Sequence, residues 1–158
     1  MRTRRQRVAA LSGTQWGVIA LSVVLLPPIQ LMLKSRGLKR TAALLAAQSD
    51  RPLGISDRDT ATSMAEAVSL VAGRRVVGAL CLGRSLLLWF LLRRRGMDAA
   101  LIVGSKSHVD ETWMAHAWVE LDGHPVNDVA DVRDHYASFG LDLPRLRPSS
   151  AGAAGRRG

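Results

Sequence analysis

Cys81 is the only cysteine of this 158-residue chain, and it stands where a reactive thiol could be used. It opens a mostly apolar run that predicts a helix ending at Gly96. In the first turn of a helix, unpaired backbone N–H groups and the helix dipole favour the thiolate, and Arg84 adds a positive charge one turn on. The same N–H groups can stabilise the oxyanion that forms when a thiolate attacks a carbonyl. A lone cysteine is more often only a small buried side chain, so its role depends on its neighbours.

His116 lies in the middle of a predicted strand, 113–121, whose residues alternate in type. The alternation places His116, Trp118 and Glu120 on one face of the strand and small apolar residues on the other. A histidine in mid-strand must find partners, because burying an unsatisfied imidazole is costly. A cysteine nucleophile needs an imidazole within hydrogen-bond reach and a third group that fixes the tautomer of the imidazole. His116 is therefore the candidate general base for Cys81.

Asn127 and Asp128, near the end of the return strand, are the candidates for the third group. The choice depends on the turn at Asp122-Gly123. A two-residue turn would point the Asp128 carboxylate away from His116. A three-residue loop with Gly123 in the left-handed position pairs His116 with Asp128 and turns Asn127 to the other face. We favour this loop, which is common in hairpins, and with it a Cys-His-Asp triad.

The other three histidines are predicted to lie at the surface. His108 falls in a polar segment, His124 beside a turn and His135 among charged residues. A zinc site that combined His116 and His124 with carboxylates would lack the ligand spacing of motifs such as H-E-x-x-H or C-x-x-C. No glycine-rich phosphate-binding loop follows a predicted strand. The sequence therefore predicts no metal and no cofactor.

The formal net charge of +9 raises the question of nucleic acid as a partner. The basic residues form short clusters, mainly at the two ends of the chain and at 93–95, without interleaved aromatic residues at the ends. No zinc-finger, helix-turn-helix or RNA-binding motif is present, so we expect solvated basic termini and no nucleic-acid partner. With one cysteine an internal disulfide is excluded, which favours a reducing, cytoplasmic environment.

Residues 16–33 carry no charge and follow a basic run, a pattern similar to a signal peptide or a transmembrane helix. Pro27-Pro28 leaves about eleven continuous apolar residues, fewer than the roughly 20 that a spanning helix needs. No convincing cleavage site follows. We expect two helical pieces, about 15–26 and 28–48, that cover the core. A protein that is peripheral to the membrane, touching it without spanning it, is the alternative.

Helical patterns come first along the chain and strand patterns last, which predicts an α+β fold. A helix near 58–74 has Ser56 or Asp57 as its cap, and Arg93 to Arg95 and Gly96 suit the end of the Cys81 helix. This helix is apolar on nearly all sides, so it should be central and packed on a small antiparallel sheet. The expected strands are 98–105, 113–121 and 124–130, and 131–140 should form a short helix or turn. The chain should divide into a helical, apolar and basic part at 1–50, a catalytic core at 51–140 and a disordered tail at 141–158.

The run "LLRRRGMDAALIVG" at the end of the Cys81 helix, the strand "AHAWVELDG" and the pair "ND" together resemble the transglutaminase-like branch of papain-type cysteine enzymes. More closely, the chain resembles the leader peptidases of lasso-peptide biosynthesis, in the short form without a fused leader-recognition domain. The resemblance covers about residues 55–137 and implies a transglutaminase-like core fold. By motif position it implies Cys81 as the nucleophile, His116 as general base and acid, and Asp128 as the residue that orients the imidazole.

The resemblance also implies a substrate and partners. The activity would be ATP-independent removal of the leader from a ribosomally made precursor peptide. A separate small recognition protein would bind the leader, and an ATP-dependent cyclase would close the released core peptide into its ring. Two other functions stay open: acyl transfer to an amine, as in transglutaminases, and a non-catalytic, membrane-associated scaffold. No side chain is assigned to the oxyanion hole.

Overall fold

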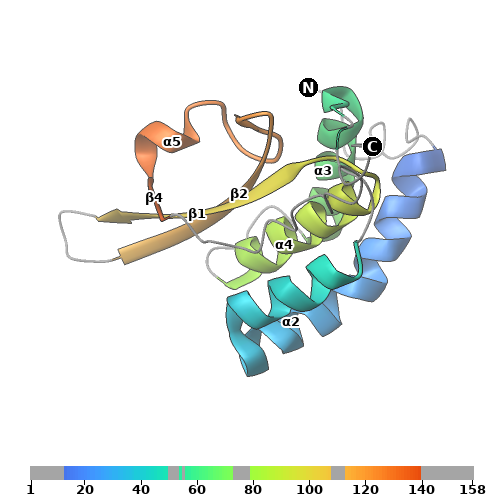
Figure 1. Ribbon diagram of the computed structural model, residues 1–158, viewed down its shortest axis with the longest axis horizontal. Coiled ribbons are helices and arrows are strands. Elements are labelled where there is room, and N and C mark those ends of the chain that lie inside the picture. Colours follow the sequence, from blue (N-terminus) through green and yellow to red (C-terminus); the bar gives the residue numbers. More distant parts are fainter. Residues whose placement is uncertain (1–12, 50–53, 55, 73–78, 108–112, 140–158) are drawn as a thin grey trace, which may run out of the picture.

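The structure is a computed structural model that describes residues 13–49, 54, 56–72, 79–107 and 113–139 (Figure 1). Helices come first and a small antiparallel sheet follows, so the predicted α+β class is confirmed. The tail expected at 141–158 and the polar segment at 108–112 lie outside the described residues. The elements are α2 (Gly13–Ala47), α3 (Arg58–Ala72), α4 (Ala79–Arg94), β1 (Ala99–Ser107), β2 (Trp113–Leu121), β3 (His124–Pro125), α5 (Val132–His135) and β4 (Ala137–Phe139).

Helix α4 is central and buried, as its all-round apolar pattern predicts. Each residue from 86 to 92 is at most 4% exposed. Its C-terminus is a Schellman motif, in which Gly96 has a φ of 81° and the Met97 amide donates to the Leu92 carbonyl at 3.2 Å. Trp89 ties the helix to the sheet, because its indole N–H donates to the carbonyl of Ala99 at 3.0 Å. A rigid α4 gives Cys81, near its other end, a fixed position.

The sheet has the strand order β3-β2-β1-β4, with antiparallel pairing throughout. Strands β1 and β2 pair along their whole length, and this register sets Gly104 opposite His116. One face of the sheet packs on α4 through Leu101, Val119 and Leu121, which belong to the buried core. The segment that carries α5 lies on the side of the sheet away from α4 (Figure 1). The fourth strand, β4, was not predicted; the sequence indicated only a short helix or turn there.

Helix α2 bends at a place that differs from the prediction. The sequence favoured a break at Pro27-Pro28, but the helix continues through both prolines, and the non-helical residue is Gly37 (φ 74°, ψ 172°). Both prolines are exposed, and the carbonyls that lose their donors belong to Val23 and Val24, which are also exposed. Water can solvate these carbonyls, so the cost of the prolines is modest. Gly37 adopts a backbone conformation that other residues rarely reach, and there the chain turns.

Helix α3 begins at Arg58 and is capped by Asp57, one of the two predicted caps, whose Oδ1 accepts a hydrogen bond from the amide of Thr60 at 3.0 Å. Both α2 and α3 pack against α4. The three helices together bury the core on the side of α4 that faces away from the sheet (Figure 1).

The hairpin after β2 corrects the predicted loop. Leu121 pairs with His124, so the connection is a two-residue turn. Asp122 (φ 51°) and Gly123 (φ 76°) both have positive φ, as a type I′ turn requires. An aspartate followed by glycine suits this turn, and its twist matches that of the strands, so no bulge forms. The return strand β3 is also much shorter than the predicted 124–130.

Candidate active site

Cys81 is the third residue of α4 and is 7% exposed. It therefore lies in the first turn of the helix, at the positive end of the helix dipole. The thiol forms hydrogen bonds with the imidazole of His116 and with the backbone of Ala117. The helix thus brings the single cysteine to the middle of β2.

His116 links the thiol to a carboxylate. Its Nε2 is hydrogen-bonded to Oδ2 of Asp128, which leaves Nδ1 for the thiol of Cys81. The side chains of His116 and Asp128 are 21% and 18% exposed, so the pair is accessible but largely screened from water. The imidazole also packs against the ring of Tyr136, with 4.9 Å between the ring centroids. The structure therefore brings together all three residues that the sequence singled out.

The surroundings of Cys81 favour its thiolate. Burial raises the pKa of the thiol, but hydrogen bonds with His116 and with the Ala117 backbone lower it. The positive charges of His116 and Arg84 act in the same direction, and the net effect is a pKa below the ordinary value. This is the condition that makes a cysteine nucleophilic near neutral pH.

The pKa of His116 is raised, whereas that of Cys81 is lowered. The hydrogen bond with Asp128 is the largest cause, followed by the hydrogen bond with Cys81, and together they raise the pKa of His116 to about 9 despite burial. Burial raises the pKa of Asp128, but its hydrogen bonds with His116 and with the Val129 amide hold the net value below the ordinary one. The three shifts all favour the charged forms of the groups: thiolate for Cys81, imidazolium for His116 and carboxylate for Asp128.

The open edge of β2 explains how α4 reaches this strand. The Val126 amide still donates to the Val119 carbonyl at 2.9 Å, but the next ladder position is taken by a side chain. Oδ1 of Asn127 accepts from the Val119 amide at 2.7 Å, and the chain then leaves the sheet. Because successive residues of a strand hydrogen-bond to opposite neighbours, the backbone groups of Ala117 are free of β1 and face this open edge. They hydrogen-bond with α4 instead.

Ser85 makes the second connection across this edge. Its hydroxyl donates to the carbonyl of Ala117 at 2.7 Å and accepts from Nδ2 of Asn127 at 3.0 Å. Since Ser85 is one turn after Cys81, both residues lie on the α4 face that meets β2. Asn127, the alternative candidate for the third residue of the triad, thus hydrogen-bonds with Val119 and Ser85 and supports the site from there. Asp128 reaches His116 although the turn has two residues, because the chain has already left the strand and its alternation no longer applies.

Sequence reasoning did not single out Ser85 or Tyr136. A signal existed for Ser85, because a fully buried serine in an otherwise apolar helix must find a hydrogen-bond partner. Tyr136 gave no comparable signal, since it follows a four-residue helix in a charged segment. It reaches His116 only because β4 pairs with β1 and returns the chain to the sheet.

An ion pair between a buried glutamate and an exposed arginine fixes the face of β2 that carries His116. Glu120 is 2% exposed, accepts from the Trp118 indole at 2.8 Å and is held by two nitrogens of Arg133. Arg133 belongs to α5, so this pair fastens α5 to the sheet. Trp118 is fully buried and packs near both other rings of the site. Its ring centroid lies 6.0 Å from that of His116 and 6.4 Å from that of Tyr136.

Replacing Gly104 by alanine is expected to damage this packing. A Cβ at Gly104 would lie 3.0 Å from the Cβ of Tyr136 and 3.1 Å from both the Ala137 carbonyl and the Trp118 ring. We expect a loss of about 1–3 kcal/mol in the free energy of unfolding, with weaker activity, because backbone and a buried ring must move. Gly17→Ala is the control: nothing lies within 4 Å of a Cβ there, so unfolding should be unchanged or shifted upward. Equal midpoints in chemical denaturation for the two variants would contradict this packing.

Other titratable groups do not add a metal site. Within the parts of the chain that the structure describes, no cluster of three or more histidine, cysteine or acidic side chains could hold a metal ion. His124 and His135 are exposed. His108 lies outside the described residues.

Comparison with known proteins gives one match. The sequence profile described as the transglutaminase-like superfamily matches residues 23–139, which is more than half of the chain. The matched stretch includes Cys81, His116 and Asp128, together with the whole of the described sheet. No curated protein and no solved structure matches the chain.

Proposed function

The chain belongs to the transglutaminase-like superfamily, and on that basis we propose that it is a cysteine protease that removes the leader from a ribosomally made lasso precursor peptide. The observation that carries the proposal is the imidazole of His116, which is hydrogen-bonded to a carboxylate and to the only thiol of the chain. Acyl transfer through cysteine requires a thiol that is hydrogen-bonded to an imidazole and a carboxylate that orients the imidazole.

In the first step the Cys81 thiolate attacks the carbonyl carbon of the scissile peptide bond. The positive end of the α4 dipole, where Cys81 lies, favours the negative charge of the oxyanion. When the tetrahedral intermediate collapses, the C–N bond breaks and the His116 imidazolium gives its proton to the leaving amine. The products of this step are the released amine and a thioester on Cys81.

In the second step water resolves the thioester. The now neutral His116 removes a proton from water, the resulting hydroxide attacks the thioester carbonyl, and the C–S bond breaks. The thiolate–imidazolium pair is restored, and the peptide leaves as a carboxylic acid that loses its proton to solvent. Asp128 keeps the imidazole oriented and stabilises its positive charge in both steps. Neither of the two proposed steps uses a cofactor.

The substrate is proposed from the resemblance of the Cys81 helix and the "AHAWVELDG" strand to leader peptidases. A precursor peptide would be delivered by a small leader-recognition protein, and an ATP-dependent cyclase would act on the released core. We place this reaction in the cytoplasm. The one-domain chain supplies the catalytic groups, and leader selection would belong to the recognition protein.

Mass spectrometry of the products tests this function. The chain, a candidate precursor and its recognition protein are incubated with and without a primary amine such as glycine methyl ester. Hydrolysis gives two fragments whose masses sum to that of the precursor plus one water. If the new carboxyl end instead appears as an amide of the added amine, the protein is an acyltransferase. If no bond breaks, the proposal is wrong.

The reactivity of Cys81 gives a second test that needs no substrate. Because the pKa of Cys81 is below its ordinary value, alkylation by iodoacetamide should be faster at pH 7 than that of an ordinary thiol, and its pH profile should be shifted to lower pH. In His116→Ala the thiol loses the hydrogen bond and the positive charge of the imidazole, so its pKa should rise from its lowered value. We expect alkylation at pH 7 to slow by about 10–100-fold in this variant. The single cysteine makes the assay free of background; an unchanged rate would contradict the thiolate–imidazolium pair.

A further inference from the structure

The first half of α2 is apolar on both its inner and its outer side, and its few polar side chains lie on the inner side. Between residues 16 and 33 the only hydrogen-bonding side chains apart from Trp16 are Ser22 and Gln30. Both point inward: Ser22 is fully buried and donates to the Val18 carbonyl at 2.7 Å, and Nε2 of Gln30 is buried against α4. Gly83 leaves room for that amide, since a Cβ there would lie 2.3 Å from Nε2 of Gln30.

The opposite side of the same half-helix is apolar and open. Its large side chains are 45–68% exposed, with Val24 and Leu31 the most exposed at 68%. At 100° per residue these positions fall on one face, which runs for about 22 Å along the axis. Monomeric soluble proteins rarely expose so continuous an apolar surface. We call this surface the outer face of α2; it consists of Trp16, Ala20, Leu21, Val23, Val24, Pro27, Pro28 and Leu31.

Basic residues precede and follow the outer face in the sequence. The first 49 residues contain eight arginines and lysines and no aspartate or glutamate. Four of the basic residues precede the face in sequence, and the other four, all exposed, follow it. They are Arg2, Arg4, Arg5 and Arg7, then Lys34, Arg36, Lys39 and Arg40.

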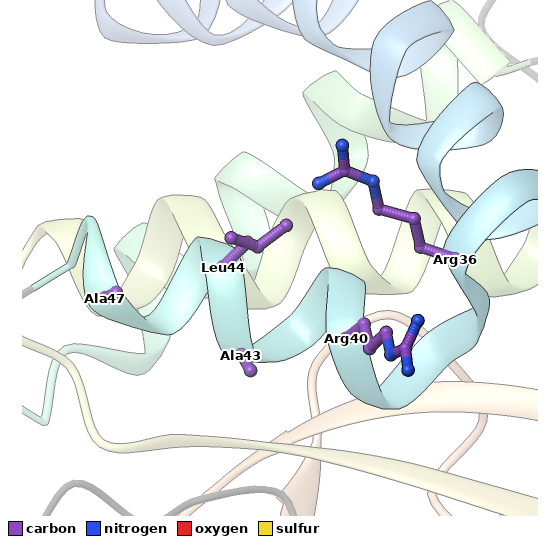
Figure 2. A pocket seen from close by; sticks show the side chains of 5 residues that line it. All are labelled: Arg36, Arg40, Ala43, Leu44 and Ala47. Atoms are coloured by element: carbon purple, nitrogen blue, oxygen red, sulfur yellow. The ribbon is translucent and has the colours of Figure 1, made fainter.

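A shallow pocket lies just past the bend of α2. Figure 2 shows the side chains of Arg36 and Arg40 beside an apolar wall that includes Leu44. The pocket has a volume of about 460 Å³. Among the described residues no carboxylate pairs with either arginine. Two guanidinium groups beside apolar carbons suit a phosphate joined to an acyl chain, because arginine binds phosphate through paired hydrogen bonds.

From this arrangement we propose that the outer face of α2 binds the surface of an anionic phospholipid bilayer. The apolar side chains enter the boundary between headgroups and acyl chains, and the four exposed basic residues that follow the face, from Lys34 to Arg40, contact lipid phosphates. By length and composition α2 could also cross a membrane. Its inner face, however, packs into the protein core through Val18 and Ile29, so the helix lies in the plane of the surface while α4 stays above it. The inference goes beyond the proposed protease function and does not rest on it.

Vesicle co-sedimentation with the full chain tests the inference. The probes are vesicles of phosphatidylcholine alone and vesicles that also contain phosphatidylglycerol. We expect binding to the mixed vesicles, weakened by salt and much weaker on pure phosphatidylcholine. Alkaline carbonate should release the protein, whereas retention would indicate a spanning helix and overturn the proposal. Equal binding to both kinds of vesicle would overturn the role of anionic lipid.

Paired variants separate the two parts of the surface. Val24→Glu with Leu31→Glu should weaken binding at least about tenfold, because it puts charge into the apolar face. Arg36→Glu with Arg40→Glu should weaken it at least about 25-fold, since each basic residue near an anionic surface contributes about fivefold. Val129→Glu is the matched control: this valine is 59% exposed, lies outside α2, and should leave binding unchanged. All variants should keep the circular dichroism spectrum of the parent chain.

Two further readouts decide what covers the outer face. Tryptophan emission should shift to the blue on mixed vesicles and lose this shift in Trp16→Phe, because Trp16 is 51% exposed whereas Trp89 and Trp118 are buried. Sedimentation velocity without vesicles should give a monomer. If Val24→Glu with Leu31→Glu instead dissolves a dimer, or if no vesicle binding is seen, a second copy or a protein partner covers the face and the membrane proposal fails.

Discussion

Cys81→Ala is expected to abolish peptide cleavage, with a loss of about 10⁴-fold or more. The chain has no second thiol, and the hydrogen bonds of His116 and of the Ala117 backbone converge on this one. Without a nucleophile the imidazole and carboxylate have no acyl-enzyme to form or resolve. The measurement is the rate of fragment appearance from a precursor peptide by mass spectrometry, with the recognition protein present.

Stability must be measured beside activity in this variant. The Cys81 side chain is small and only 7% exposed, so its truncation should lower the free energy of unfolding by about 1 kcal/mol. His116→Ala should lose about as much activity as Cys81→Ala, because the members of a catalytic unit are not additive. Cleavage that survives in a folded Cys81→Ala protein would rule out thiol catalysis.

The elements of the fold follow closely from the sequence. The all-apolar pattern of α4 predicts a buried central helix, the Arg93-to-Gly96 ending predicts its termination, and alternation predicts β2 over the observed residues. These are local signals, in which composition and period agree with the environment that the residues meet. Cys81 and His116 were identified in the same way, from their positions on a helix start and a strand.

The long-range features were harder to predict. Alternation carried past Val126 gave the wrong loop and the wrong geometry for Asp128, because nothing local shows that the side chain of Asn127 replaces a carbonyl of the return strand. The break at Gly37 was missed since exposed prolines cost less than buried ones. Tyr136 was missed because its contact with His116 depends on the pairing of β4 with β1. In each case tertiary contacts overrode the local pattern.

Asp128→Asn is expected to lower kcat by about 10²–10⁴-fold and to change its pH dependence. Cleavage should rise with pH through the lowered pKa of Cys81 and fall as His116 loses its proton near pH 9, because the leaving amine then has no acid. The hydrogen bond with Asp128 is the largest cause of the raised pKa of His116. An amide at 128 removes the negative charge, so the high-pH limb should move toward neutral pH. The measurement is kcat against pH, together with the histidine titration by NMR.

Asn127→Ala is the matched control, because Asn127 is adjacent in sequence and supports the site without a hydrogen bond to His116. Its loss leaves the Val119 amide without an acceptor, which should cost about 1–3 kcal/mol in the free energy of unfolding. The high-pH limb should nevertheless stay where it is in the parent chain. If Asn127→Ala moves that limb and Asp128→Asn does not, the imidazole is oriented by Asn127, as in a papain-like arrangement. The two variants thus separate an electrostatic partner of His116 from a residue that only holds the edge of β2 open for Cys81.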